Sequence, residues 1–191
     1  GVTITSTTDL TAPSTLEIPN AFGHGTSTSV EIEQPVSTDL TISEKTTSDK
    51  ELPETLSVEM ETTASLIVDT PNLTVSLEGS YTAVEATTAE NTLIVAKNTV
   101  IETLTVKKGN VKIYGTVGEI VNEGTGKIIR CIDAQDEVER TLADTRCDHI
   151  LIEKPAGTLD FGGGTTTKQV CVEASVTISN LIVSPVKEHA V

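Results

Sequence analysis

The chain has 191 residues, of which 37% are hydrophobic and 2% aromatic, and its formal net charge is −15. A domain typically has ~150 residues, so this length predicts one domain, or at most one and a half. The charge excludes a general nucleic-acid binder, because phosphate contacts need Lys and Arg. The apolar runs in the chain are short and fall far below the ~20 residues needed to span a membrane as a helix.

The residue types favour strands over helices. Thr is the commonest residue with 33 copies, followed by 20 Val and 16 Ile, whereas the chain has one Met and no Trp. These β-branched residues fit the pleated surface of a sheet. The sequence therefore predicts an all-β protein with an aliphatic core.

The first part of the chain, residues 1–50, is less regular than the rest. It is rich in Thr and Ser, contains three prolines, and keeps only scattered alternating segments such as Val30-Glu31-Ile32. Because the open end of a stacked β-structure exposes edge strands, we interpret residues 1–50 as an N-terminal cap with irregular first coils. Residues 1–96 hold 15 acidic and 2 basic side chains, so the N-terminal half is the acidic one.

Residues 51–191 carry a loose repeat of short apolar runs separated by Pro, Gly or Asn. The repeat has a length of about 19 residues, and its anchors are Leu56, Leu73, Leu93, Val111, Ile128, Ile150 and Val170. Two or three short strands per repeat indicate a β-solenoid, in which each coil buries its inward side chains only by stacking on the next. We expect Leu56, Leu73, Leu93 and Val111 to form one inward ladder.

The alternative architecture is a β-sandwich, which also has short alternating strands. Sandwich cores usually bury large aromatic side chains, and this chain has only two Tyr and two Phe. The narrow interior of a solenoid suits branched aliphatic side chains, so the solenoid is the favoured prediction.

Two segments resemble a known superfold. The stretches 64–77 and 107–118 are similar to repeats in secreted bacterial right-handed parallel β-helix proteins, the pectate-lyase-like superfold. The resemblance covers residues 56–130 well and 150–183 more loosely, and it contains no catalytic motif. It implies a single right-handed parallel β-helix, and it leaves open a lyase, a glycosidase, an adhesin or a passive stalk, because fold does not determine function.

One segment, residues 133–146, interrupts the strand pattern. Asp133 is placed as an N-cap, acidic residues follow it, and Val138 and Leu142 have the i, i+4 spacing. These are helix signals. We therefore predict a short helical insertion between two coils.

The three cysteines, Cys131, Cys147 and Cys171, are an odd number and have no C-x-x-C spacing. This excludes a complete disulfide framework and the common zinc motifs. Apolar–acidic pairs that recur at equal steps place Cys131, Leu151 and Cys171 in one ladder, in which the first and last are too far apart for a disulfide. A bond between Cys131 and Cys147 remains open, the alternative being reduced cysteines that pack as small hydrophobes.

Two other sets of residues are weaker candidates for chemistry. Gly124-Thr125-Gly126-Lys127 lacks the first Gly and the final Ser or Thr of a phosphate-binding loop, so it is interpreted as a turn. His24, His149 and His189 are too scattered for a triad to be assembled, and are interpreted as surface histidines.

The acidic pairs are the stronger candidates for a site. Glu31 and Glu33, Glu59 and Glu61, and Glu85 lie at outward positions of predicted strands. If the coils bring them together, they could chelate calcium or act as an acid and a base. The alternative is a solvated negative face that keeps copies of the protein apart.

The predicted function is therefore non-catalytic, with no catalytic residues, cofactor or metal assigned. Because the chain begins with Gly1 rather than Met, we expect that a leader was removed or that Gly1 is a cloning remnant. The composition favours export, to the medium or to the cell surface, and the resemblance to secreted β-helix proteins implies a bacterial source. We expect a monomeric scaffold, adhesin or ligand-presenting module whose partner is a glycan or a surface protein. The alternative is a carbohydrate-active enzyme or glycan-binding domain on the same fold.

Overall fold

The computed structural model describes residues 3–6, 13–18, 27–44, 55–87, 92–123, 127–132, 138–140, 146–152, 156–160, 166–172 and 178–182. Side chains are described within residues 13–18, 29–44, 55–87, 92–123 and 127–131. The chain divides into two compact units, Gly1–Gly126 and Lys127–Val191. The described residues of both units contain strands and turns and no helix, so the prediction of an all-β protein is confirmed.

The strands of the first unit are β1 (Thr3–Ser6), β2 (Ser14–Ile18), β3 (Ser27–Ile32), β4 (Leu40–Glu44), β5 (Thr55–Asp69), β6 (Thr74–Ala86), β7 (Thr92–Val95), β8 (Val100–Val106), β9 (Asn110–Ile113) and β10 (Thr116–Asn122). The strands of the second unit are β11 (Ile128–Ile132), β12 (Val138–Arg140), β13 (Arg146–Ile152), β14 (Ala156–Asp160), β15 (Thr166–Val172) and β16 (Ile178–Ile182).

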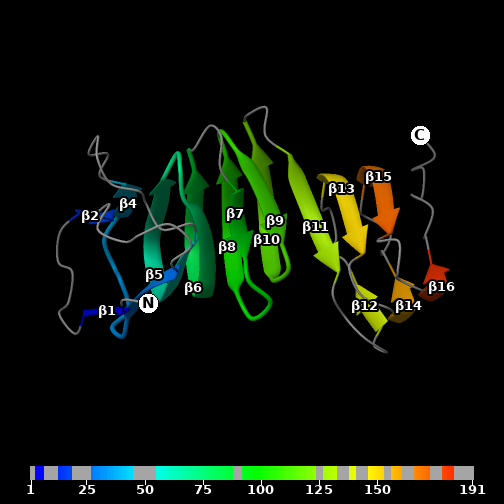
Figure 1. Cartoon of the computed structure of the whole chain (residues 1–191), viewed down its shortest axis with the longest axis horizontal. Coiled ribbons are helices and arrows are strands. Elements are labelled where there is room, and N and C mark those ends of the chain that lie inside the picture. The colour runs from blue at the N-terminus through cyan, green and yellow to red at the C-terminus, as the bar shows by residue number, and fades with distance from the viewer. Residues whose placement is uncertain are drawn as a thin grey trace, which may run out of the picture. The chain divides into compact units, whose positions relative to one another are not determined.

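Within the first unit the strands form two rows, and every described pairing is parallel (Figure 1). The first row runs β1, β3, β5, β6, β7, β9, and the second runs β2, β4, β5, β6, β8, β10. The long strands β5 and β6 give their first halves to the first row and their second halves to the second row. This is a parallel β-solenoid, and it excludes the sandwich, whose sheets are antiparallel.

The core of the first unit consists of inward columns of aliphatic side chains. In the first row, Leu56, Val75, Leu93 and Val111 lie in register, and all four are at most 5% exposed. Strand alternation sends every second residue inward, and stacking at ~4.8 Å places each side chain on the equivalent one of the next coil. A parallel column of Val58, Leu77, Val95 and Ile113 is also buried.

The prediction that Leu73 belongs to the inward column of Leu56, Leu93 and Val111 was wrong. Leu73 is buried, but it lies in the turn before β6 and donates its backbone N–H to the Thr70 carbonyl oxygen at 3.3 Å. Val75 takes the place in the column opposite Leu56. With Val75 as the anchor, the steps along the column from Leu56 to Val111 become nearly equal, which is more regular than the spacing that includes Leu73.

The corner between the two rows has a column of its own. Val36, Thr62, Tyr81, Ile101 and Val117 are paired in succession, and all are buried. The chain turns this corner through a register shift between Thr62 and Ser65 in β5. The narrow interior thus accommodates one tyrosine ring at a corner, while its flat sides are aliphatic.

The described part of residues 1–50 already belongs to the coils. Strands β1 and β3 pair in the first row, and β2 and β4 pair in the second. The stretch of chain between paired residues is longer in the coils up to β5 than in the described coils that follow them in this unit, so the first coils are longer than the later ones. The predicted N-terminal cap stays a prediction, and only the segments of residues 1–50 outside these described strands are left for it.

The second unit repeats the arrangement of parallel rows. Its first row is β11, β13, β15 and its second is β12, β14, β16. Cys131, Leu151 and Cys171 lie in one register column, as the equal steps between apolar–acidic pairs predicted. The predicted register is therefore confirmed in this unit.

The predicted helix over residues 133–146 was wrong where the segment is described. Val138–Arg140 forms strand β12, which pairs in parallel with residues 158–160 of β14. A pair of apolar residues at i, i+4 stabilises a helix by only ~0.2–0.5 kcal/mol. Backbone pairing with the next coil outweighs that local preference.

Candidate functional site

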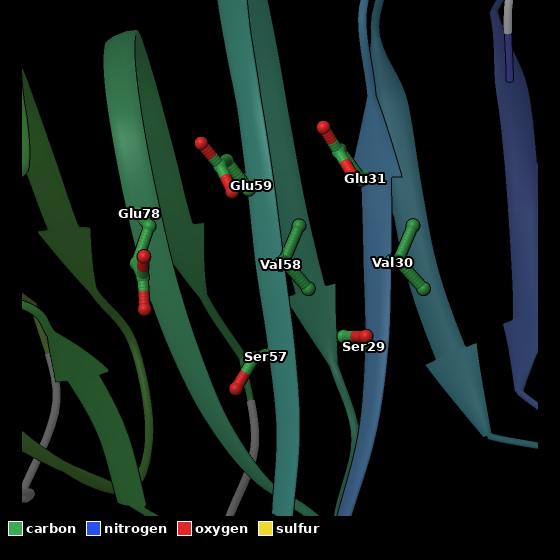
Figure 2. Close-up of a pocket in the computed structure, with 7 residues that line it drawn as sticks. All are labelled: Ser29, Val30, Glu31, Ser57, Val58, Glu59 and Glu78. Atoms are coloured by element: carbon green, nitrogen blue, oxygen red, sulfur yellow. The ribbon is translucent and has the colours of Figure 1, made fainter. Parts of the chain in front are cut away.

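The outer face of the first row carries a column of three glutamates. Glu31 of β3, Glu59 of β5 and Glu78 of β6 are directly in register, and all three side chains are exposed. Figure 2 shows them on three neighbouring strands, with Val30 and Val58 turned the other way. The alternation that sends the valines into the core is what aligns these carboxylates, so the coils do bring the predicted Glu31 and Glu59 together.

Two shallow hollows lie along this column and share Glu31 and Glu59. One, of about 230 Å³, is completed by Ser29, Ser57 and Glu78. The other, of about 330 Å³, is bordered by Glu33 and Glu61. We call the five glutamates Glu31, Glu33, Glu59, Glu61 and Glu78 the acidic face.

The acidic face lacks the convergence that calcium chelation needs. Among the described residues, no group of three or more His, Cys, Asp or Glu side chains is arranged to hold a metal ion. The carboxylates stand side by side along a flat sheet, whereas calcium requires about 6–8 oxygen ligands around one point. None of the described residues that line the hollows is basic. The arrangement therefore offers a dense negative surface that can attract cationic groups from solution.

The remaining predicted glutamate, Glu85, lies elsewhere. It is in the second half of β6, in the second row, and its carboxylate accepts from the Lys107 ammonium at 2.9 Å. That hydrogen bond raises the pKa of Lys107 above its usual value, with the charge of Glu85 adding to the effect. Glu85 is thus a half-buried member of an ion pair in the second row and does not extend the acidic face.

Tyr81 lies beneath the acidic face, inside the coil. Its ring is buried, and its hydroxyl donates to the backbone carbonyl oxygens of Glu78 at 2.8 Å and Val58 at 3.2 Å. Burial raises the pKa of Tyr81 well above its usual value, and the charges of Glu78 and Glu59 raise it further. Tyr81 is therefore a neutral structural residue, neither a general base nor a platform for a sugar ring.

The other aromatic residues give little support to a sugar site. Tyr114 is half-buried at the turn after β9, and Phe22 and Phe161 lie outside the described residues. His149 lies on β13, opposite Ile129 and Gln169, whereas His24 and His189 lie outside the described residues.

The disulfide between Cys131 and Cys147 stays a prediction, because the Cys147 side chain is not among those described. Cys131 lies opposite Leu151, and Cys147 comes earlier on β13, opposite Thr167. The strand from Cys147 to Leu151 covers about 13 Å, whereas a disulfide needs α-carbons within ~7 Å. The bond would therefore require β13 to take a different register.

Glu78 is the member of the column that the sequence interpretation missed. Its signal was available: the apolar–acidic pair Leu77-Glu78 matches Val58-Glu59, and both β-strands carry the pair at the same register position. The pair was obscured because Gly79 follows it where Met60 follows Glu59.

A scan against protein-family models, a search of curated proteins and a search of solved structures each found no match for this chain. In the described part of the chain, no helix has the length and hydropathy that a membrane crossing requires.

Proposed function

We propose that the protein is a non-catalytic scaffold that is exported and displays its polar outer face to a partner at the cell surface. The observation that supports this best is that the inward face of each strand is aliphatic and packs the core, whereas the outward face is polar and free to contact a partner. Inward positions form closed aliphatic columns such as Leu56, Val75, Leu93 and Val111. Outward positions repeat at the strand spacing, as in the glutamate column, so the fold presents like groups at regular intervals.

The electrostatics of the acidic face favour a partner with cationic groups. Five glutamates are exposed on strands β3, β5 and β6 and in the turn after β3. Such a surface raises the local concentration of cations and speeds encounter with a basic partner. A basic segment of a surface protein or an amino-bearing glycan has the required charge.

The alternative is a carbohydrate-active enzyme or glycan-binding domain. Neighbouring carboxylates in register are the observation in its favour, since retaining glycosidases use two carboxyl groups ~5–5.5 Å apart. Against it stand the shallow hollows and the burial of Tyr81, because sugar sites usually stack rings on exposed aromatic side chains.

A paired screen separates the two functions. The full chain is applied to a glycan array and, in parallel, incubated with acidic and neutral polysaccharides while new reducing or unsaturated ends are measured. The test variant combines Glu31→Gln, Glu59→Gln and Glu78→Gln. The control variant combines Glu102→Gln, Glu119→Gln and Glu123→Gln, which removes three exposed charges away from the acidic face.

The scaffold is supported if the wild type binds a glycan without turnover, the test variant loses this binding and the control variant keeps it. Turnover that follows the same pattern overturns the scaffold in favour of the enzyme. Absence of both binding and turnover, with both variants folded, excludes a glycan partner and leaves a basic segment of a surface protein as the partner of the acidic face.

A further inference from the structure

The turn between β5 and β6 contains a motif that none of the roles above uses. Asn72-Leu73-Thr74 is the only Asn-x-Ser/Thr triplet in the chain, and its middle residue is not proline. This triplet is the acceptor signal for N-linked glycosylation, in which a bulky, solubilising glycan is attached at the surface of an exported protein.

The structure places the acceptor side chain outside the coil. Residues 71 and 72 form the turn and are exposed, and Leu73 is only 1% exposed because its side chain enters the core. The buried leucine therefore fixes the turn, so that Asn72 faces solvent while its neighbour faces the interior. A glycan on Asn72 would extend into solvent and would displace none of the inward columns.

Contacts with Glu44 leave room for the modification. Glu44 accepts from the Asn72 backbone N–H at 2.9 and 3.1 Å, and its Oε1 accepts from the Asn72 Nδ2 at 2.6 Å. The amide nitrogen carries two hydrogens. A glycosylated amide keeps one of them, so the hydrogen bond to Glu44 and the sugar can coexist.

We propose that Asn72 is an acceptor for an N-linked glycan, a role that depends on the export included in the proposed function. The donor is a polyprenyl pyrophosphate oligosaccharide, supplied by the membrane through which the chain is translocated. The Asn72 amide nitrogen attacks C1 of the first sugar, the bond between C1 and the pyrophosphate oxygen breaks, polyprenyl pyrophosphate leaves, and the amide loses one proton. No oxidant or reductant is needed.

The test is secretion of the full chain from a eukaryotic host through an added signal peptide, followed by mass spectrometry. The tryptic peptide between Lys50 and Lys97 contains the triplet, and we expect it to carry one oligosaccharide that an amide-cleaving glycosidase removes, leaving Asp at position 72. Asn72→Gln and Thr74→Val should each abolish the modification, and Thr74→Ser should retain it.

Asn98 provides an internal control, because it is also exposed in a turn but has Val100 where the acceptor motif needs Ser or Thr. Thr74→Val leaves the Asn72 contacts with Glu44 in place, so a loss of glycan in that variant is independent of any folding defect in Asn72→Gln. Secreted protein with an unmodified Asn72, or with the glycan on Asn98, overturns the proposal. The binding and turnover screens use unglycosylated protein, so their failure is distinguishable from failure of this assignment.

Discussion

The hydroxyl of Thr62 is buried in the corner column, and its Oγ1 has no hydrogen-bond partner. A buried hydroxyl without a partner costs about 1–3 kcal/mol. We predict that Thr62→Val raises the free energy of unfolding by about 1 kcal/mol, as measured by urea denaturation.

Thr99 is the matched control for Thr62. It is also buried, but its hydroxyl donates to the Leu77 carbonyl oxygen at 2.6 Å. Thr99→Val should therefore lower the free energy of unfolding by about 1–2 kcal/mol, since it leaves a buried carbonyl with one partner fewer. Destabilisation by Thr62→Val equal to that by Thr99→Val would contradict the structure at the corner.

The free energy of unfolding depends on pH through the carboxyl group of Glu44. Burial raises the pKa of Glu44 above 4.5 in the folded chain, with the Asp69 charge adding to it and the bonds from Asn72 opposing it. A raised folded pKa means that the folded state binds the proton more tightly. This contribution to stability is complete below the unfolded pKa, near 4.5, and is lost as the pH rises through the folded pKa.

Glu44→Gln removes this titration while keeping an oxygen that can accept from Asn72. We predict that the stability of the wild type relative to Glu44→Gln falls as the pH is raised from acidic to neutral, in denaturant unfolding at a series of pH values. Glu17→Gln, at the start of the same row, serves as the control for a general loss of charge. If the free energy of unfolding of the wild type instead rises relative to that of Glu44→Gln as the pH increases, the prediction is contradicted.

At the scale of the element, β6 can change rows because its bend contains a glycine. Gly79 has φ of +110°, and a Cβ at this position would overlap the Met60 carbonyl oxygen of the neighbouring coil. Both the left-handed conformation and the close backbone approach disfavour a side chain. We predict that Gly79→Ala lowers the free energy of unfolding by about 3 kcal/mol or more.

Gly109, with φ of +81°, is the control that separates the cost of the left-handed conformation from the cost of the contact with Met60. It lies in the turn before β9, where Gly109→Ala should cost only the conformational penalty of about 1–2 kcal/mol. Thermal unfolding monitored by circular dichroism measures both variants. Equal losses would show that the contact with Met60 contributes nothing.

The register of β11, β13 and β15 limits the disulfides that can form. Cys131 and Cys171 are separated by the intervening strand that contributes Leu151, which places their α-carbons about 9.6 Å apart, beyond the ~7 Å that a disulfide allows. We predict that non-reducing peptide mapping of the monomer finds no Cys131–Cys171 crosslink. Finding that crosslink would refute the register, whereas finding a Cys131–Cys147 bond would refute only the register of β13.

For the whole molecule, the dominant physical property is the net charge of −15. Like charges opposite one another on neighbouring strands are destabilising, and salt screens exposed charges. We predict that added NaCl raises the melting temperature, and that the triple glutamine variant of Glu31, Glu59 and Glu78 gains less from salt than the triple variant of Glu102, Glu119 and Glu123. An equal gain in the two variants would mean that the aligned column adds no repulsion beyond the net charge.

Much of the fold could be predicted from the sequence because the relevant signals are local and repeat. Alternation of apolar and polar residues fixes which side chains of β5 and β6 face inward. The equal steps between apolar–acidic pairs fix the register that joins Cys131, Leu151 and Cys171. A shortage of aromatic residues indicates a narrow interior. Each of these features is set by strand geometry, which every coil shares.

The tertiary structure decided the remainder. Val75 replaces Leu73 in the column because a turn delays the start of β6, and Val138–Arg140 is a strand because it pairs with the next coil. The alignment of Glu78 with Glu59 and Glu31 follows from the register of β3, β5 and β6. Glu85 is separated from them because it lies in the half of β6 that pairs with β8. These outcomes depend on contacts between residues about one coil apart, whose free energies exceed the few tenths of a kcal/mol of local preference, so no short stretch of sequence could predict them.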